Sequence, residues 1–323
     1  MKKVIALVLS VITLFAFISC KKEKSNDTYN LAVVDGAPLL SAMNVSDGFA
    51  YETDNNVYNT QMQIVPSGND VVSTLIAGLS NGTYDMAIMP VNAAAKIHAT
   101  DEKYKLAAVN VFGNIYIVGK ETINNDLNNL KGKVVYLTSG GGTPQAAFLR
   151  LLKGKNIEAM QGDTAVGGKV VYRTSMPAEI MQGLKNGNVE YAVLAEPVVR
   201  KFTGATGASV VFDIQSEWKN LNDNAVFTQA GLLVNSENVN IDYVKALVEK
   251  LKENKEYLQN NVENLKTSIT TLYKDTTMGL NFSNAVIDRC NIGCEIASSL
   301  KTDIALFLTA HGMTAPADSF YLF

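Results

Sequence analysis

Two stretches, Leu79–Met89 (LSNGTYDMAIM) and Leu184–Leu194 (LKNGNVEYAVL), form an internal repeat whose copies start 105 positions apart (184 − 79). Both copies have Asn-Gly, an acidic residue and an alanine at equivalent positions. Apolar residues at helical spacing precede each Asn-Gly and an apolar run follows it, so each copy is typical of the end of a strand–loop–helix–strand unit. A single pair of such units predicts two similar lobes rather than a solenoid, with a cleft between them.

Outward from the repeat, short apolar runs alternate with amphipathic segments. This alternation predicts an α/β fold in which each lobe is a mostly parallel sheet flanked by helices. We expect strands at residues 31–34, 62–65, 84–89, 169–173 and 191–194. Two further apolar runs, 106–119 and 225–234, are interpreted as strands that cross between the lobes. Lobe 1 is then residues 30–115 plus 230–323, and lobe 2 is residues 116–229.

Composition excludes several functional classes. The chain has 28 Lys and Arg against 31 Asp and Glu, a net charge of −3, so no basic excess is available to neutralise a nucleic-acid backbone. The hydrophobic fraction of 47% argues against disorder. Two histidines and three cysteines show no metal-ligand spacing. We therefore expect no nucleic-acid partner, no metal site and no cofactor.

The first residues have the pattern of a targeting segment. Met1-Lys2-Lys3 is followed by an uncharged run, residues 4–18, which is too short for a span of about 20 apolar residues. The run ends at Ser19-Cys20, which resembles the lipobox of bacterial lipoproteins. That resemblance implies a signal peptide over residues 1–19, a lipid on Cys20 and a lipid-anchored tether over residues 20–30. An ordinary secretory signal and a short N-terminal anchor are the alternatives.

The strongest local signal is a glycine-rich turn between an expected strand, residues 134–138, and an expected helix from Gln145. Thr143 fits an N-cap and Pro144 the first helical residue. Backbone N–H groups at such a turn can hold an oxyanion or a polar ring substituent. A tight turn that merely needs glycine explains the same residues, because the segment matches neither a P-loop nor GxGxxG.

Ligands of α/β sheets bind beyond the carboxyl ends of strands, where the loops of both lobes here would converge. Most side chains in these loops are uncharged and polar, which favours recognition of a small polar solute over covalent chemistry. The expected lobe 1 wall consists of Gly36, Ala37, Pro38, Ser67, Gly68 and Asn92. The expected lobe 2 wall consists of Tyr116, Ser139, Gly140, Gly141, Gly142, Thr143, Ser175 and Glu196.

Two members of this set have particular expected roles. Tyr116 could offer a stacking surface, and Glu196 could accept from an amine or ring N–H, or could cap a neighbouring backbone group. We expect no catalytic residue, because GxSxG, HExxH and kinase glycine-loop motifs are missing. Cys290 and Cys294 could form a disulfide outside the cytoplasm or pack as reduced thiols.

Over nearly the whole chain beyond the targeting segment, the sequence resembles the extracytoplasmic solute-binding proteins of ABC importers, in the branch for nitrate, sulfonate, taurine and thiamine-pyrimidine ligands. The matching stretches are Asp70–Asn92, Asn129–Tyr136, Leu194–Pro197, Glu217-Trp218, Thr228–Val234, Arg289–Ile292 and Pro316–Tyr321. The resemblance implies a periplasmic-binding-protein type II fold, in which two lobes joined by two hinge strands close on a ligand.

The resemblance also implies how the protein would work. It would be a monomer, lipid-anchored on the extracytoplasmic side of a bacterial membrane, that delivers a small polar or heteroaromatic solute to an ABC permease and its ATPase. Two other functions remain open. One is a biosynthetic enzyme on the same fold, and the other is a ligand sensor or adhesin without transport.

Overall fold

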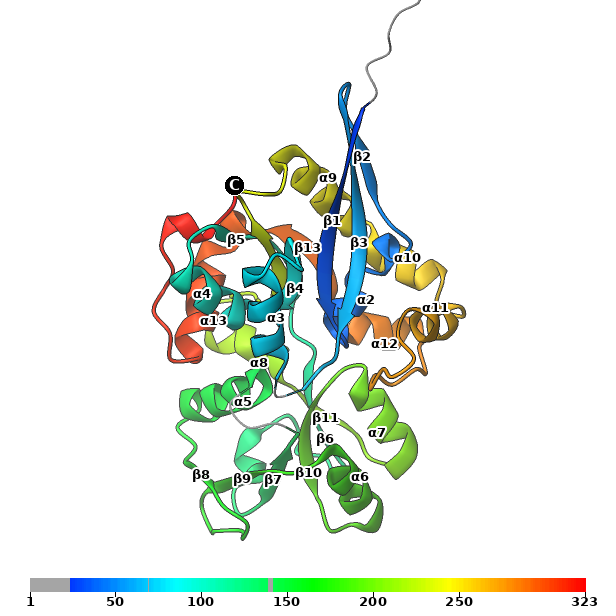
Figure 1. Cartoon of the computed structure of the whole chain (residues 1–323). Helices are drawn as coiled ribbons and strands as arrows, with labels where there is room; N and C mark the ends of the chain where they lie inside the picture. Colours follow the sequence, from blue (N-terminus) through cyan, green and yellow to red (C-terminus); the bar gives the residue numbers. More distant parts are fainter. Residues whose placement is uncertain (1–23, 69, 139–141) are drawn as a thin grey trace, which may run out of the picture.

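The computed structural model describes residues 24–68, 70–138 and 142–323. The expected signal peptide, the lipid site Cys20 and the turn residues Ser139, Gly140 and Gly141 lie outside the described residues. Two sheets organise the described chain into the two bodies of Figure 1, lobe 1 above and lobe 2 below.

Lobe 1 is built on a seven-stranded sheet of the described residues, in the order β13-β5-β12-β4-β1-β3-β2. Its strands are β1 (Ser25–Val34), β2 (Ala50–Glu52), β3 (Asn56–Val65), β4 (Met86–Pro90), β5 (Tyr104–Val111), β12 (Ala230–Asn235) and β13 (Ile292–Ile296). Strand β1, between β4 and β3 in this order, pairs in parallel with both of them. The carboxyl ends of these three strands therefore share one edge of the sheet.

Lobe 2 is built on a six-stranded sheet of the described residues, in the order β11-β6-β10-β7-β9-β8. Its strands are β6 (Ile115–Gly119), β7 (Val134–Leu137), β8 (Ala159–Gln161), β9 (Val170–Thr174), β10 (Tyr191–Ala195) and β11 (Ser209–Asp213). Strand β7 pairs in parallel with β10 and β9, as β1 pairs with β4 and β3 in lobe 1.

Helices flank both sheets. Those of lobe 1 are α2 (Ala37–Leu40), α3 (Val71–Ser80), α4 (Val91–Thr100), α9 (Ile241–Lys252), α10 (Asn254–Asn260), α11 (Leu265–Leu272), α12 (Asn284–Arg289) and α13 (Lys301–Ala310). Those of lobe 2 are α5 (Thr143–Gly154), α6 (Pro177–Asn186), α7 (Val198–Thr206) and α8 (Ile214–Leu221). Short 3-10 segments occupy Met43–Val45, Leu127–Leu130, Ala297–Leu300 and Asp318–Phe320.

The internal repeat corresponds to the same local structure in each lobe. Helix α3 ends before Gly82, whose φ is 77°, and α6 ends before Gly187, whose φ is 83°. Glycine adopts this left-handed conformation without a Cβ penalty, so it ends each helix and turns the chain into the following strand. The predicted helix–turn–strand units and the two-lobed α/β architecture are confirmed.

Two details of the predicted sheets are wrong. Among the described strand pairs, four of the six in lobe 1 are antiparallel, whereas three of the five in lobe 2 are parallel. The strands next to the crossings between the lobes, β5, β6 and β12, are antiparallel to their neighbours. The run 106–119 also breaks at Phe112–Asn114, where Gly113 has a φ of 91°. Two irregular segments therefore join the lobes, and neither is a continuous strand. We call residues 112–114 the first connection and residues 222–229 the second connection.

Two further expectations differ locally. Residues 25–30 of the expected tether belong to β1, where they pair in parallel with residues 56–61. Backbone hydrogen bonds to β3 hold this end of the strand. A strand therefore forms here although the side chains are polar. Helix α5 has Gly142 as its N-cap, and Thr143 is its first residue rather than its cap.

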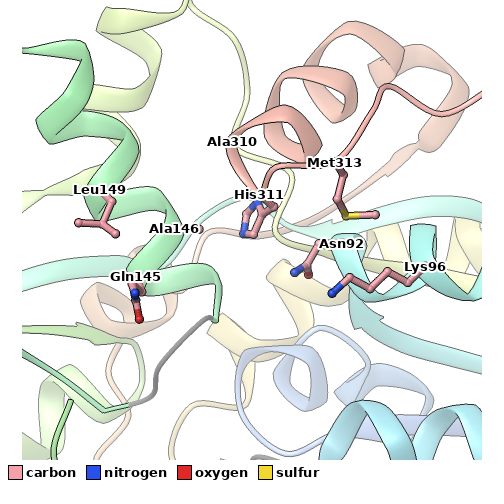
Figure 2. Close-up of a pocket in the computed structure, with 8 residues that line it drawn as sticks. All are labelled: Asn92, Lys96, Gln145, Ala146, Leu149, Ala310, His311 and Met313. Carbon is pink, nitrogen blue, oxygen red and sulfur yellow. The ribbon is translucent and has the colours of Figure 1, made fainter. Parts of the chain in front are cut away.

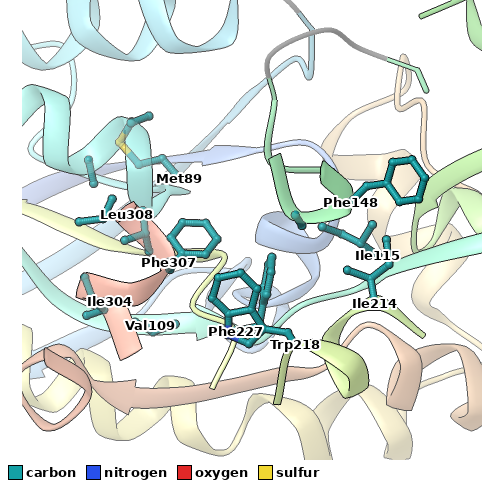
Figure 3. Packing of buried hydrophobic residues seen from close by; sticks show 14 of the residues in the cluster. Met89, Val109, Ile115, Phe148, Ile214, Trp218, Phe227, Ile304, Phe307 and Leu308 are labelled. Atoms are coloured by element: carbon teal, nitrogen blue, oxygen red, sulfur yellow. The ribbon is translucent and has the colours of Figure 1, made fainter. Parts of the chain in front are cut away.

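A continuous apolar core crosses between the lobes (Figure 3). Phe227, from the second connection, packs edge-on against Trp218 of α8 at 5.0 Å and against Phe307 of α13 at 5.2 Å between ring centroids. A Cβ on Gly113, in the first connection, would lie 2.9 Å from the Gln215 Cβ. Both connections are thus packed against the α8 region.

Candidate ligand-binding site between the lobes

A cavity of about 240 Å³ has walls from both lobes. As Figure 2 shows, α4 and the end of α13 form one side and the first turns of α5 form the other. The lining residues are Asn92, Lys96, Gln145, Ala146, Leu149, Ala310, His311 and Met313. This volume suits a solute smaller than the drug-sized ligands that fill pockets of about 300–1,000 Å³.

The formal charge of the described cavity lining is positive. Asn92 lies in the first turn of α4 and Gln145 in the first turn of α5, where unpaired backbone N–H groups give a helix its positive end. Lys96, one turn beyond Asn92, adds a formal charge. None of the described lining residues is a carboxylate. The carboxyl end of α13, at Ala310 and His311, adds partial negative charge on one side. The formal charge of Lys96 is therefore what favours an anion over a cation.

Asn92 and His311 each bring a buried polar atom without a protein partner to this cavity. No donor among the described residues reaches the Asn92 Oδ1, and an amide can present either its oxygen or its amino group after a flip. The Nδ1 of His311 lies 2.8 Å from the Phe307 carbonyl oxygen and donates to it, while its Nε2 has no described partner. Burial, and then the Lys96 charge, lower the pKa of His311 below its ordinary value.

Of the expected site residues that the structure describes, Asn92 lines this cavity. The others on the lobe 1 wall lie beyond β1 and β3. Gly36 is the N-cap of α2, with Ala37 and Pro38 as its first two residues. Ser67 and Gly68 are exposed, and the Ser67 hydroxyl lies 3.1 Å from the Thr277 hydroxyl.

On the lobe 2 wall, Gly142 and Thr143 begin α5 and are therefore next to Gln145. Ser175 follows β9, and its hydroxyl donates to the Glu179 carboxylate in the first turn of α6. That local bond occupies the side chain expected to meet a solute.

Tyr116 and Glu196 do not line this cavity, and Tyr116 borders a separate one of about 290 Å³ beside Asp213 and Arg289. Tyr116 is 3% exposed, and its hydroxyl donates to the Arg289 carbonyl oxygen at 2.9 Å. The Glu196 Oε2 accepts from the Arg200 N–H at 3.0 Å, and its Oε1 is paired with Arg289. The backbone-capping alternative for Glu196 is thus observed. Burial is the main reason that its pKa is raised above the ordinary value.

Sequence reasoning missed Lys96, Gln145 and His311. Lys96 was detectable as the residue four positions after Asn92, which places both on one helix face. Gln145 was detectable as the third residue of the helix that follows the glycine turn. His311 had no local signal, because α13 reaches the site only through the tertiary fold.

Other chemistry is limited among the residues described. Cys290 and Cys294 are buried free thiols, and burial raises the pKa of Cys294 to about 12. No group of three His, Cys, Asp or Glu in the described chain could hold a metal ion. None of the described helices has the length and apolar character needed to cross a membrane.

Comparison with known proteins gives structural relatives. No protein-family model and no curated protein matches the sequence. An ABC transporter structure from Parabacteroides distasonis is 21% identical with a TM-score of 0.71, over 91% of this chain and 98% of that chain. The periplasmic aliphatic sulphonate binding protein SsuA from Escherichia coli is 13% identical with a TM-score of 0.61, over 89% and 88%.

The periplasmic nitrate-binding protein NrtA from Synechocystis is 15% identical with a TM-score of 0.59, over 92% of this chain and 85% of that chain. At these identities the likeness shows the fold, which is that of periplasmic binding proteins: two α/β lobes, each a sheet flanked by helices.

Proposed function

We propose that this chain is the solute-binding component of an ABC importer and holds its solute between the lobes. The observation that carries the proposal is the cavity whose walls come from α4 and α13 of lobe 1 and from α5 of lobe 2. A solute that contacts both walls stabilises the closed arrangement over an open one. The similar folds of the sulphonate-binding and nitrate-binding proteins support the same reading.

The solute is a small anion of the sulfonate or nitrate kind. Lys96, the first turns of two helices and the amino group that Asn92 presents after a flip complement an oxyanion. A pyrimidine-like ring is disfavoured, because Tyr116 is buried and His311 is the sole aromatic side chain among the described lining residues.

The membrane arrangement is part of the same proposal. A lipid on Cys20 would hold the protein, as a monomer, on the extracytoplasmic side of a bacterial membrane beside its permease and ATPase. Labelled palmitate should enter the expressed chain and be absent from the Cys20→Ala variant. Equal labelling of both would refute the anchor.

The solute proposal is tested by calorimetric titration with ethanesulfonate, taurine, nitrate and a hydroxymethylpyrimidine. We expect one anion to bind with one-to-one stoichiometry, and the pyrimidine not to bind. Tight binding of the pyrimidine alone, or of none of the four, would contradict the assignment.

A further inference from the structure

One buried carboxylate of lobe 2 is paired with an arginine of lobe 1. The Arg289 Nε donates to the Glu196 Oε1 at 2.8 Å, and its Nη2 lies 2.7 Å from the same oxygen. Glu196 is 2% exposed. Arg289 ends α12 in lobe 1, whereas Glu196 follows β10 in lobe 2. The pair therefore spans the lobes, with the carboxylate buried and the Arg289 side chain 34% exposed.

The neighbouring residue Pro197 touches a second segment of lobe 1. A Cβ placed on Gly279 would lie 2.5 Å from the Pro197 carbonyl oxygen and 3.1 Å from the Lys201 Cβ. Only glycine permits this approach without displacement of the backbone. The two segments, one from each lobe, are thus in close contact at Gly279.

Hydrogen bonds tie the segment before Gly279 to lobe 1. The Asp35 carboxylate accepts from the Thr276 hydroxyl at 2.7 Å and from the Thr277 N–H at 2.9 Å. Asp35 directly follows β1, an interior strand of the lobe 1 sheet. The contact at Pro197 is therefore made by a loop between α11 and α12 that is tied to the end of β1.

Further bonds join the same two regions. The Asn114 amide donates to the Glu196 carbonyl oxygen at 2.6 Å, and the Tyr116 hydroxyl donates to the Arg289 carbonyl oxygen at 2.9 Å. Asn114 belongs to the first connection, and Tyr116 follows it in β6 of lobe 2. The turn and its arginine partner are thus fixed to that connection.

We propose that lobe 1 binds lobe 2 at the Glu196-Pro197 turn before any solute is present. Arg289 is then a positioning residue that keeps the lobes closed. Withdrawal of the guanidinium would leave a buried carboxylate uncompensated, which is strongly unfavourable. The fraction of chains already closed then sets part of the apparent solute affinity. This closed arrangement depends on contacts between protein groups and not on the identity of the solute.

Single-molecule energy transfer on the dialysed full chain in detergent tests this proposal without added solute. Ile76 of α3 and Met160 of β8, both exposed, are replaced by an azide-bearing amino acid for dye attachment. We expect one dominant high-transfer population in the parent chain. Arg289→Met and Gly279→Ala should each shift molecules to a lower-transfer population.

Matched controls separate this role from general destabilisation. Lys255→Met removes a more exposed cation that pairs with Asp288 on α12, and Gly204→Ala adds a Cβ on α7 where nothing lies within 4 Å. Both should leave the distribution unchanged. A distribution that is the same in Arg289→Met, Gly279→Ala and the parent chain would overturn the proposal. Because no solute is used, this failure is distinct from failure to find a ligand.

Discussion

Asn92 and Gln145 lie on opposite walls of one cavity, each in the first turn of a helix from a different lobe (Figure 2). The two residues are 53 positions apart (145 − 92) and belong to α4 and α5. A small solute that touches both side chains must also lie at the positive ends of both helices. This relationship links solute binding to the arrangement of the lobes.

Asn92→Leu should separate stability from binding. The substitution keeps the side-chain volume roughly constant and removes an amide whose Oδ1 has no described partner. Stability should stay the same or rise, because an unsatisfied buried acceptor is costly, whereas affinity for the bound anion should fall. Urea unfolding and calorimetric titration measure the two effects. A variant that binds as tightly as the parent would exclude Asn92 from the site.

Lys96→Met should weaken anion binding by about 10- to 100-fold, since hydrogen bonds to charged groups contribute about 1.5–3 kcal/mol. Affinity of the parent chain should also decline with added salt, and less steeply in the variant. Lys153→Met, farther along α5 and outside the cavity lining, is the matched control. Equal losses in the two variants would point to net charge rather than to a contact.

His311 should make stability depend on pH. Burial, followed by Lys96, lowers its pKa in the folded state from an ordinary 6.5. As the pH falls through 6.5, the unfolded chain takes up the proton first, so stability present above 6.5 is lost toward the lower folded-state pKa. His311→Gln should flatten this part of the curve of melting temperature against pH. Curves that stay parallel between pH 5 and 7.5 would contradict this assignment.

Phe227 should be among the costliest residues to truncate. Its ring contacts Trp218 and Phe307 edge-on and is 1% exposed. Phe227→Ala should lower the free energy of unfolding by about 3–5 kcal/mol, measured by urea denaturation. Val210→Ala, at a residue that is 37% exposed, should change it by less than about 0.5 kcal/mol. A loss below about 1 kcal/mol for Phe227→Ala would mean that the connection does not tie the lobes together.

Local sequence patterns predict much of this fold. The repeated Asn-Gly and Asn-Gly-Asn segments end helices where glycine adopts a positive φ, and the following apolar runs form the central strands β4 and β10. Such signals depend on neighbouring residues. The break at Phe112–Asn114 does not show in hydropathy, because buried residues continue on both sides of it in different sheets.

The site is harder to predict because it is assembled from distant segments. Lys96, Gln145 and His311 come from three helices and meet only in the folded chain. Glu196 and Arg289 are 93 positions apart, and their pairing turns an expected ligand contact into a contact between lobes. No local spacing rule distinguishes these two roles for a glutamate at a strand end.

Native mass spectrometry of the gently purified chain tests the central claim most directly. We predict that the parent chain retains a single small anion and that Asn92→Leu and Lys96→Met release it. A parent chain that carries no solute and takes up none of the sulfonates or nitrate, or a solute that remains bound equally well in both variants, would contradict a solute site between α4 and α5.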